Sequence, residues 1–343
     1  MSRFQVVAIS YLLLGCITVT VCAQTRRERV FVGSPVWVSE DEFVVSLTED
    51  SKNHLYVLYV GKDGVVVRTK SLVPKNVLPI APLPKERRVT VMQRGHPAKM
   101  GLFDLKTLHL SWLPISGANP KPESQGKLIA FVNTDTDKDG LNIYVWDSQR
   151  RKERKVTQDL SVREFLWAPR RSEIAFISVG IGVDEMSGVF AVGVASSDGS
   201  PQRVLVADLL PKTGLGWSHD GQRIFFCVWN SERKEFEVRS VRVDTGQQTV
   251  VATSVPVGYK YARVRRTWRD PYLIFQSGPT RVTRLNIEQE KSESINFAEE
   301  FKRWEPSPSG LLCAVITSLG PELLVGNWET GEVIRASSLN QER

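Results

Sequence analysis

Cysteine and histidine are scarce in this chain, with four of each among 343 residues. The histidines show no metal-ligand spacing and have no cysteine nearby; they are His54, His96, His109 and His219. Nothing matches the G-x-S-x-G nucleophile elbow either. A self-contained zinc motif or serine-hydrolase motif is therefore excluded, whereas carboxylates brought together from distant segments would leave no local pattern.

Two of the four cysteines, Cys227 and Cys313, lie outside the N-terminal apolar segment, in the strand-like runs "IFFCVW" and "LLCAVI". They occupy similar places in separate repeats, so we expect them to lie far apart. They are therefore predicted to be buried free thiols rather than a disulfide.

Long uncharged stretches are also rare, and the one from Phe4 to Thr25 lies at the N-terminus. Small residues at Val21-Cys22-Ala23 suit signal peptidase, which predicts a signal peptide over residues 1–23 and an exported domain over 24–343, periplasmic or secreted. Two alternatives remain open: an uncleaved anchor, and a lipoprotein attached through Cys16 of "LLGC". No membrane span is expected after the signal is removed.

No sustained helical period is present, and the charge excess is mild at +7. Such a charge favours solubility and does not argue for nucleic acid as a partner.

A repeated pattern organises the chain. The segment "WSHDGQRIFF" (217–226) aligns with "WAPRRSEIAF" (167–176), "PESQGKLIAF" (122–131) and "PSPSGLLCAV" (306–315). Weaker copies are "WVSEDEFVV" (37–45), "PLPKERRVTV" (82–91) and "WRDPYLIF" (268–275). The first apolar residues after the turns recur every 40 to 50 residues; they are Phe43, Val89, Ile129, Ile174, Ile224, Leu273 and Cys313.

Further alternating apolar runs follow each of these anchors, which indicates antiparallel strands. A four-stranded unit of this length is a propeller blade, so we predict an all-β propeller with seven four-stranded blades, or six as the alternative. Trp167 and Trp217 are expected where adjacent sheets meet. To close the ring we expect strand exchange, with either residues 29–33 or residues 332–337 completing the blade begun by the other terminus.

The pattern of Trp, polar turn with Asp-Gly, and "IAF" followed by "IYVWD" resembles the TolB-like propeller repeat, most clearly over residues 122–147, 167–176 and 217–226. The resemblance implies an exported bacterial propeller that binds other macromolecules. It covers the propeller and lacks the α/β domain that precedes it in TolB itself, so a specific partner is not transferred.

One loop begins like a calcium site. In "DTDKDG" the side chains of Asp135, Asp137 and Asp139 alternate ahead of Gly140. The closing acid is missing, because Trp146 stands at the twelfth position of an EF-hand loop and Ile143 at the ninth position of a propeller calcium loop. The competing interpretation is a polar hairpin turn without a cofactor.

The segment "GYKYARVRRTWRDPY" (258–272) interleaves aromatic and basic residues. Such a mixture suits stacking on nucleic-acid bases with neutralisation of phosphates, or the binding of an acidic protein surface. The competing interpretation is a strand with one solvated basic face. The ligand-binding candidates are Tyr259, Tyr261, Arg263, Arg265 and Trp268.

These features favour a non-catalytic, monomeric scaffold that binds a protein or peptide at the cell envelope. The alternative is a small-molecule hydrolase or lyase, such as a lactonase or glycosidase, with its site in the central funnel. Inward-facing acids or histidines from several blades would distinguish the second function from the first.

Overall fold

The computed structural model describes residues 29–336 except 63, 96, 134–140, 182–187, 234, 254–263, 267–271, 287, 288, 290 and 319–321. Within these residues the polar turns and alternating apolar runs form seven four-stranded antiparallel sheets. The prediction of an all-β propeller with seven blades is confirmed, and the six-bladed alternative is wrong.

The strands of the seven blades follow one another along the chain. Blade 1 contains β1 (Arg29–Trp37), β2 (Glu42–Glu49), β3 (Lys52–Gly61) and β4 (Gly64–Val73). Blade 2 contains β5 (Val77–Leu83), the 3-10 turn η1 (Pro84–Glu86), β6 (Arg88–Gln93), β7 (Lys99–Asp104) and β8 (Leu110–Ser116). Blade 3 contains β9 (Ala118–Pro122), β10 (Leu128–Val132), β11 (Ile143–Asp147) and β12 (Lys152–Lys155).

The remaining blades repeat this order. Blade 4 contains β13 (Leu160–Trp167), β14 (Glu173–Ile181), β15 (Phe190–Ser196) and β16 (Arg203–Asp208). Blade 5 contains β17 (Lys212–Trp217), β18 (Arg223–Asn230), β19 (Glu235–Arg242) and β20 (Gln248–Thr253). Blade 6 contains β21 (Val264–Arg266), β22 (Tyr272–Gln276), β23 (Arg281–Asn286) and β24 (Lys291–Asn296). Blade 7 contains β25 (Phe301–Pro306), β26 (Leu312–Thr317), β27 (Leu323–Asn327) and β28 (Val333–Arg335).

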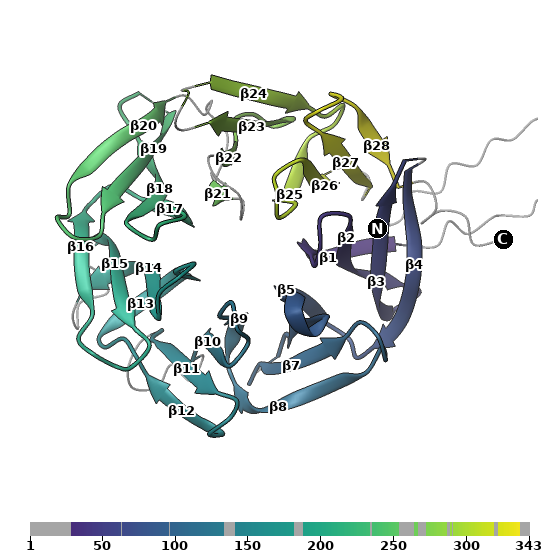
Figure 1. Ribbon diagram of the computed structural model, residues 1–343, viewed down its shortest axis with the longest axis horizontal. Coiled ribbons are helices and arrows are strands. Elements are labelled where there is room, and N and C mark those ends of the chain that lie inside the picture. Colours follow the sequence, from purple (N-terminus) through teal and green to yellow (C-terminus); the bar gives the residue numbers. More distant parts are fainter. Residues whose placement is uncertain are drawn as a thin grey trace, which may run out of the picture.

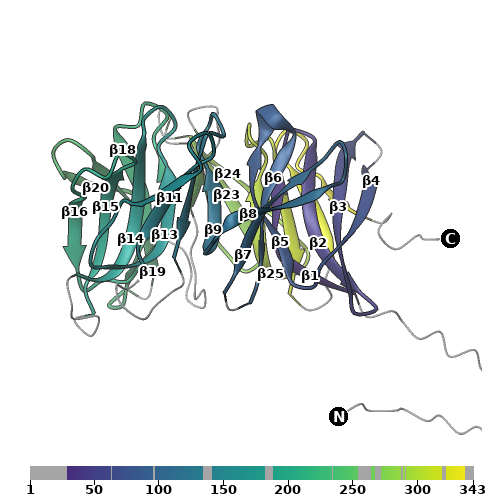
Figure 2. The same ribbon diagram turned by 90° about the horizontal axis from the view of Figure 1, so that it is seen from below.

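The first strand of each blade borders the central axis and the fourth lies at the rim (Figure 1). Figure 2 shows the ring from the side, with the strands running roughly along the axis. Apolar clusters fill the spaces between neighbouring blades, so each sheet is covered on its faces by the next sheets around the ring.

The seven anchor residues predicted from the repeat occupy one structural position. Each is the second residue of its blade's second strand, and each is at most 1% exposed. The turn before the anchor is also shared, because Gly126, Gly221 and Gly310 all have φ between 69° and 76°. In each case the glycine amide donates to the carbonyl three residues earlier, which closes a tight turn that favours glycine at this place.

The tryptophans before these turns lie between blades, as predicted. Trp167 and Trp217 are 8% and 3% exposed. The indole Nε1 of Trp167 donates to the carbonyl of Lys121 at 2.8 Å, and that of Trp217 donates to the carbonyl of Leu166 at 3.0 Å. Each acceptor lies on the innermost strand of the preceding blade. Each tryptophan therefore fills the space between two blades and also joins them by a hydrogen bond.

The predicted strand exchange is wrong. Residues 29–33 belong to β1 and pair with β2 of the same blade, and β28 completes the blade that β25 begins. Blades 1 and 7 instead meet through side chains. Arg303 donates from Nη1 to the carbonyls of Phe31 and Gly33, both at 2.9 Å, and Trp37 packs against the same boundary. Hydrogen bonds from side chains therefore perform the closure that we expected from a shared sheet.

The sixth repeat is also shifted relative to the sequence alignment. Arg266 pairs with the anchor Leu273, so Arg266, rather than Trp268, stands where Trp167 and Trp217 stand in their blades. Trp268 lies outside the described residues.

Cys227 and Cys313 are free and buried, as predicted. Burial raises the pKa of both thiols above the ordinary value. In the described part of the chain, no helix has the length and apolar character needed to cross a membrane.

Candidate functional site

The innermost strands border the axial opening and carry a clear excess of positive charge. Together β1, β5, β9, β13, β17, β21 and β25 contain eight lysines or arginines and two glutamates. Neighbouring blades cover both faces of each sheet, and the second strand covers one edge of the first. The free edge of each innermost strand therefore faces the axial opening (Figure 1).

Among the cations of these strands whose exposure the structure describes, two are exposed, namely Arg163 in β13 and Lys302 in β25. Each is the extra residue of a β-bulge, because the pairing shifts between Val162 and Glu164 in blade 4 and between Phe301 and Arg303 in blade 7. A bulge leaves its extra residue outside the ladder and re-aims its side chain. The same local irregularity thus presents a cation at equivalent places in two blades.

The residues that follow these bulges connect blades. The carboxylate of Glu164 accepts hydrogen bonds from the amide of Gly214 at 3.0 and 3.1 Å and from the hydroxyl of Thr213 at 2.9 Å. Glu164 stands three residues before Trp167, and Arg303 stands three residues before Pro306, which is the same place in its own blade. Both side chains bond the bulged innermost strand of the next blade.

Two lysines of the innermost strands are also held by protein groups. The Nζ of Lys121 donates to the carbonyl of Phe165 at 2.7 Å. The Nζ of Lys212 donates to the carbonyl of Leu210 at 3.0 Å and pairs with Asp208. The Lys212 side chain is fully buried, and this burial lowers its pKa although Asp208 acts in the opposite direction. Lys121, Glu164 and Arg303 therefore connect neighbouring blades, whereas Lys212 fixes the segment that leads into its own blade.

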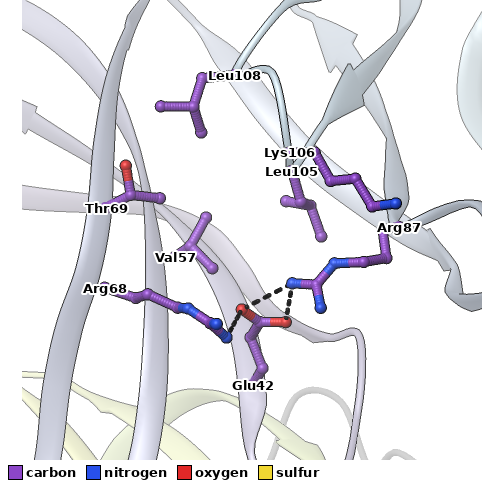
Figure 3. Close-up of a pocket in the computed structure, with 8 residues that line it drawn as sticks. All are labelled: Glu42, Val57, Arg68, Thr69, Arg87, Leu105, Lys106 and Leu108. Carbon is purple, nitrogen blue, oxygen red and sulfur yellow. Dashed lines mark hydrogen bonds and ion pairs between the residues drawn. The ribbon is translucent and has the colours of Figure 1, made fainter.

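A pocket of about 480 Å³ lies where the outer parts of blades 1 and 2 meet (Figure 3). Its lining combines charged and apolar side chains, namely Glu42, Val57, Arg68, Thr69, Arg87, Leu105, Lys106 and Leu108. At its base the Glu42 carboxylate is only 5% exposed. It accepts hydrogen bonds from Arg68 Nη1 at 3.0 Å and from Arg87 Nη2 at 2.8 and 3.2 Å.

The blade 2 side of this pocket is built from two turns that hold each other. The amide of Leu105 donates to the carbonyl of Arg87 at 3.0 Å, and Arg88 Nε donates to the Asp104 carboxylate at 3.2 Å. Asp104 Oδ1 in turn accepts from the amides of Lys106 and Thr107, both at 2.9 Å. These bonds, led by the one from Thr107, lower the pKa of Asp104 to about 2.

The candidate residues proposed from the sequence are not brought into a described site. Asp135, Asp137 and Asp139 lie outside the described residues, and so do Tyr259, Tyr261, Arg263 and Trp268. The backbone of Arg265 is placed in β21, opposite Ile274. Among the residues that are described, no three His, Cys, Asp or Glu side chains lie together as a metal ion would require.

The sequence analysis missed the residues that the structure does bring together. Glu164 and Arg303 could have been found by comparing repeats, because both carry a charge three residues before the anchor turn. Glu42, Arg68 and Arg87 carried no such signal. They come from β2, from β4 and from the turn after η1, and only the docking of two blades makes them neighbours.

No protein-family model matches this chain. No curated protein matches it either. Solved structures share its fold. An oligogalacturonate lyase in complex with manganese superposes with a TM-score of 0.65 at 10% identity, covering 85% of this chain and 87% of that one. Hydrazine synthase of Kuenenia stuttgartiensis superposes with a TM-score of 0.63 at 13% identity, covering 88% of this chain and 94% of that one. Oligogalacturonate lyase of Vibrio parahaemolyticus superposes with a TM-score of 0.61 at 10% identity, covering 88% of this chain and 93% of that one. At these identities the similarity establishes a β-propeller fold shared with enzymes of different chemistry.

Proposed function

We propose that this protein is an exported, non-catalytic β-propeller of the TolB-like type that binds a protein or peptide at the cell envelope. The supporting observation is how the charged side chains of the innermost strands are used. Lys121, Glu164 and Arg303 each bond the backbone of an adjacent blade. A carboxylate that already accepts an amide and a hydroxyl is poorly placed to act as a general acid or base.

The same contacts favour a binding role in a second way. Loops recognise partners best when a rigid scaffold holds them, and here each of several blade boundaries is fixed by hydrogen bonds as well as by apolar packing. A ring of this kind loses little conformational entropy on binding, because its loops start from fixed ends.

A hydrolase or lyase acting at the central funnel is the second candidate. The positive excess of the innermost strands and the exposure of Arg163 and Lys302 favour it, because such an opening attracts an anionic substrate. Two of the structures with a similar fold are oligogalacturonate lyases, whose name denotes an acidic oligosaccharide substrate.

A turnover assay separates the two functions. The purified chain would be incubated with oligogalacturonate, a neutral glycoside series and a lactone series, and product formation followed over time. We expect no turnover above that of the buffer. Arg150 is an exposed residue of the β11–β12 turn and serves as the control. Turnover that disappears in Arg163→Gln and persists in Arg150→Gln would show that the protein is an enzyme and contradict the scaffold function.

Export and partner binding need their own test. Cell fractionation and N-terminal sequencing are expected to place the protein outside the cytoplasm with Gln24 as its first residue. A photo-crosslinking amino acid at position 163 or 302 is expected to capture an envelope protein, whereas the same group at Val250 on the outermost strand β20 should not. A cytoplasmic protein, or equal capture from all three positions, would contradict the proposal.

A further inference from the structure

The outermost strand of blade 1 has an edge to which another strand can be added. β4 lies at the rim of the ring and pairs on one side with β3 (Figure 1). Among the residues that the structure describes, only those of β3 hydrogen-bond the backbones of Thr69, Ser71, Leu72 and Val73. An edge strand presents unpaired N–H and C=O groups that an extended chain can use. The outer side of this stretch is therefore a template for a further strand.

Two local features set the length of the template. The pairing of β4 with β3 shifts between Val67 and Thr69, so Arg68 is the extra residue of a β-bulge, and a bulge interrupts an edge. At the other end Pro74 follows Val73 and has no N–H to donate. The regular part of the edge is therefore the stretch 69–73.

The outermost strands of the other blades are less suited to such pairing. Every residue of β12 is charged, β28 has three residues, and β8 contains Pro114. β16 and β20 each contain a bulge that leaves at most three regular residues on either side. β24 is regular, but its exposed residues are all polar. β4 is the outermost strand that combines a regular stretch of this length with a large exposed apolar side chain, that of Leu72.

The side chains of the stretch 69–73 alternate between the two sides of the sheet. Thr69 and Ser71 face blade 2, where Ser71 Oγ donates to the carbonyl of Leu108 at 3.4 Å. Lys70 and Leu72 lie on the other side, and Leu72 is 64% exposed. Directly opposed side chains on neighbouring strands contact one another. An apolar residue of an added strand would therefore cover the exposed surface of Leu72.

The charges of β4 favour an acidic partner. The strand contains two cations, Arg68 and Lys70, and no acid. Arg68 is 57% exposed and its partner Glu42 is 5% exposed, while Lys70 is 27% exposed and its partner Glu49 is 7% exposed. Each pair thus turns its cation toward solvent and buries its carboxylate. Acidic side chains in an approaching chain are attracted to such a surface, whereas a second copy of β4 would bring the same cations and no acid.

We propose that an extended, acidic segment of a partner protein pairs along the stretch 69–73 as a fifth strand of blade 1. Its backbone supplies the hydrogen bonds, an apolar side chain lies beside Leu72, and a carboxylate two positions away lies beside Lys70. The inference rests on the proposed function, because it names the chemistry of the protein partner. It places one contact with that partner on the rim of the ring, away from the axial opening.

A library of random nonapeptides displayed on phage provides the probe, selected on the immobilised full-length chain. We expect the enriched peptides to carry an acidic and an apolar residue two positions apart. The synthetic peptides should slow amide hydrogen exchange of the stretch 69–73 about tenfold at a concentration ten times their Kd, because exchange then requires the peptide to dissociate. Exchange of β20 should stay unchanged.

One variant and a matched control locate the site. Leu72→Asp removes the apolar contact and sets a negative charge against the acidic peptide, so we expect binding to weaken by about tenfold or more. Leu209→Asp should leave binding unchanged, because Leu209 is equally well exposed, at 69%, but lies in the connection between blades 4 and 5. Thermal unfolding of both variants shows that the fold is intact.

The role of charge is tested on the wild type alone. Replacing the acidic residue of the peptide by its amide should weaken binding, and the difference between acid and amide should shrink as salt rises. Equal binding of the two peptides at low salt would remove the carboxylate from the proposal.

Other outcomes would overturn the inference as a whole. Failure to enrich any peptide, or binding that Leu72→Asp leaves unchanged, would remove the site. A dimer in sedimentation equilibrium that Leu72→Asp disrupts would assign the edge to a second copy of the chain. Crosslinking at positions 163 and 302 tests the proposed function separately, so a failure there and a failure here can be told apart.

Discussion

The indole Nε1 of Trp37 donates a hydrogen bond of 2.8 Å to the backbone carbonyl of Glu305, a residue 268 positions further along the chain. Trp37 ends the innermost strand of blade 1, and Glu305 lies on the innermost strand of blade 7. Trp167 and Trp217 make the same bond to Lys121 and Leu166, which directly precede Pro122 and Trp167, the residues that pair with the anchors of blades 3 and 4. The ring is therefore closed by the same type of indole-to-carbonyl hydrogen bond that joins neighbouring blades elsewhere in it.

Replacing Trp37 tests this closure. Trp37→Phe removes the indole donor and part of a buried ring, so we expect the free energy of unfolding to fall by about 1–3 kcal/mol. Urea denaturation measures this value. Trp112→Phe, at a 38% exposed tryptophan on the outermost strand β8, should change it by less than about 0.5 kcal/mol. Equal effects of the two substitutions would remove the special role of Trp37.

Arg303→Met tests the second contact between blades 1 and 7. It leaves the carbonyls of Phe31 and Gly33 without their guanidinium donor, which should cost about 1–3 kcal/mol of unfolding free energy. The neighbouring Lys302→Met changes an exposed side chain, and we expect it to be close to neutral. Denaturation of the two variants side by side gives the comparison, and an Arg303 variant as stable as the Lys302 variant would show that this contact does not stabilise closure.

The hydroxyl of Tyr56 should ionise at a higher pH than that of an exposed tyrosine. Its hydroxyl donates to Glu49 at 2.8 Å, and burial, as the largest cause, raises its pKa to about 12. The folded state therefore keeps this proton longer than the unfolded state, whose pKa is near 10.0. The resulting stabilisation is complete below pH 10 and is lost as pH rises through about 12. Ultraviolet titration should show one tyrosine ionising near pH 12 that is missing in Tyr56→Phe; an unchanged curve in that variant would contradict the assignment.

Asp104 should make the protein sensitive to acid. Its pKa in the folded state is about 2, against 3.8 for an unperturbed side chain. The stabilisation it provides is therefore present above pH 3.8 and is lost as pH falls through about 2. Unfolding free energies measured from pH 5 to pH 2 should fall less steeply in Asp104→Asn than in the wild type. Asp159→Asn, in an exposed connection between blades 3 and 4, should keep the wild-type slope.

The reactivity of the two thiols tests whether the second strands of blades 5 and 7 are buried. Cys227 and Cys313 are fully buried, and their pKa values are raised by that burial. Because the thiolate is the reactive form, a disulfide reagent should modify neither in the native protein and both in urea. Rapid reaction of either thiol without denaturant would show that the second strand of its blade is open to solvent.

The repeat in the sequence predicted the fold well because the anchor positions obey one physical requirement. A residue covered by the sheets on both sides must be apolar, and it must follow a tight polar turn. Phe43 and Cys313 satisfy this as well as Ile174 does, although the residue before the turn varies between Trp and Pro. In the sixth blade the anchor Leu273 is confirmed, and Arg266 pairs with it in the place that a tryptophan takes in blades 4 and 5.

The closure and the pocket could not be predicted in the same way. Nothing in a strand's sequence distinguishes a ring closed by a shared sheet from one closed by Trp37 and Arg303. Glu42 and Arg87 are 45 residues apart and meet because two blades dock side by side. Contacts of this kind depend on how two blades are positioned relative to each other. The repeat pattern within one blade gives no information about that position.

Hydrogen exchange of the tryptophan indoles tests most directly the claim that these side chains lock the ring closed. With ¹⁵N-labelled tryptophan and single Trp→Phe variants for assignment, the indole N–H of Trp37, Trp167 and Trp217 should exchange as slowly as amides of the central strands. The indole of Trp112 should exchange at once. Slow exchange of the first three supports a ring closed through Trp37, whereas rapid exchange of Trp37 would show that blades 1 and 7 are held together in some other way.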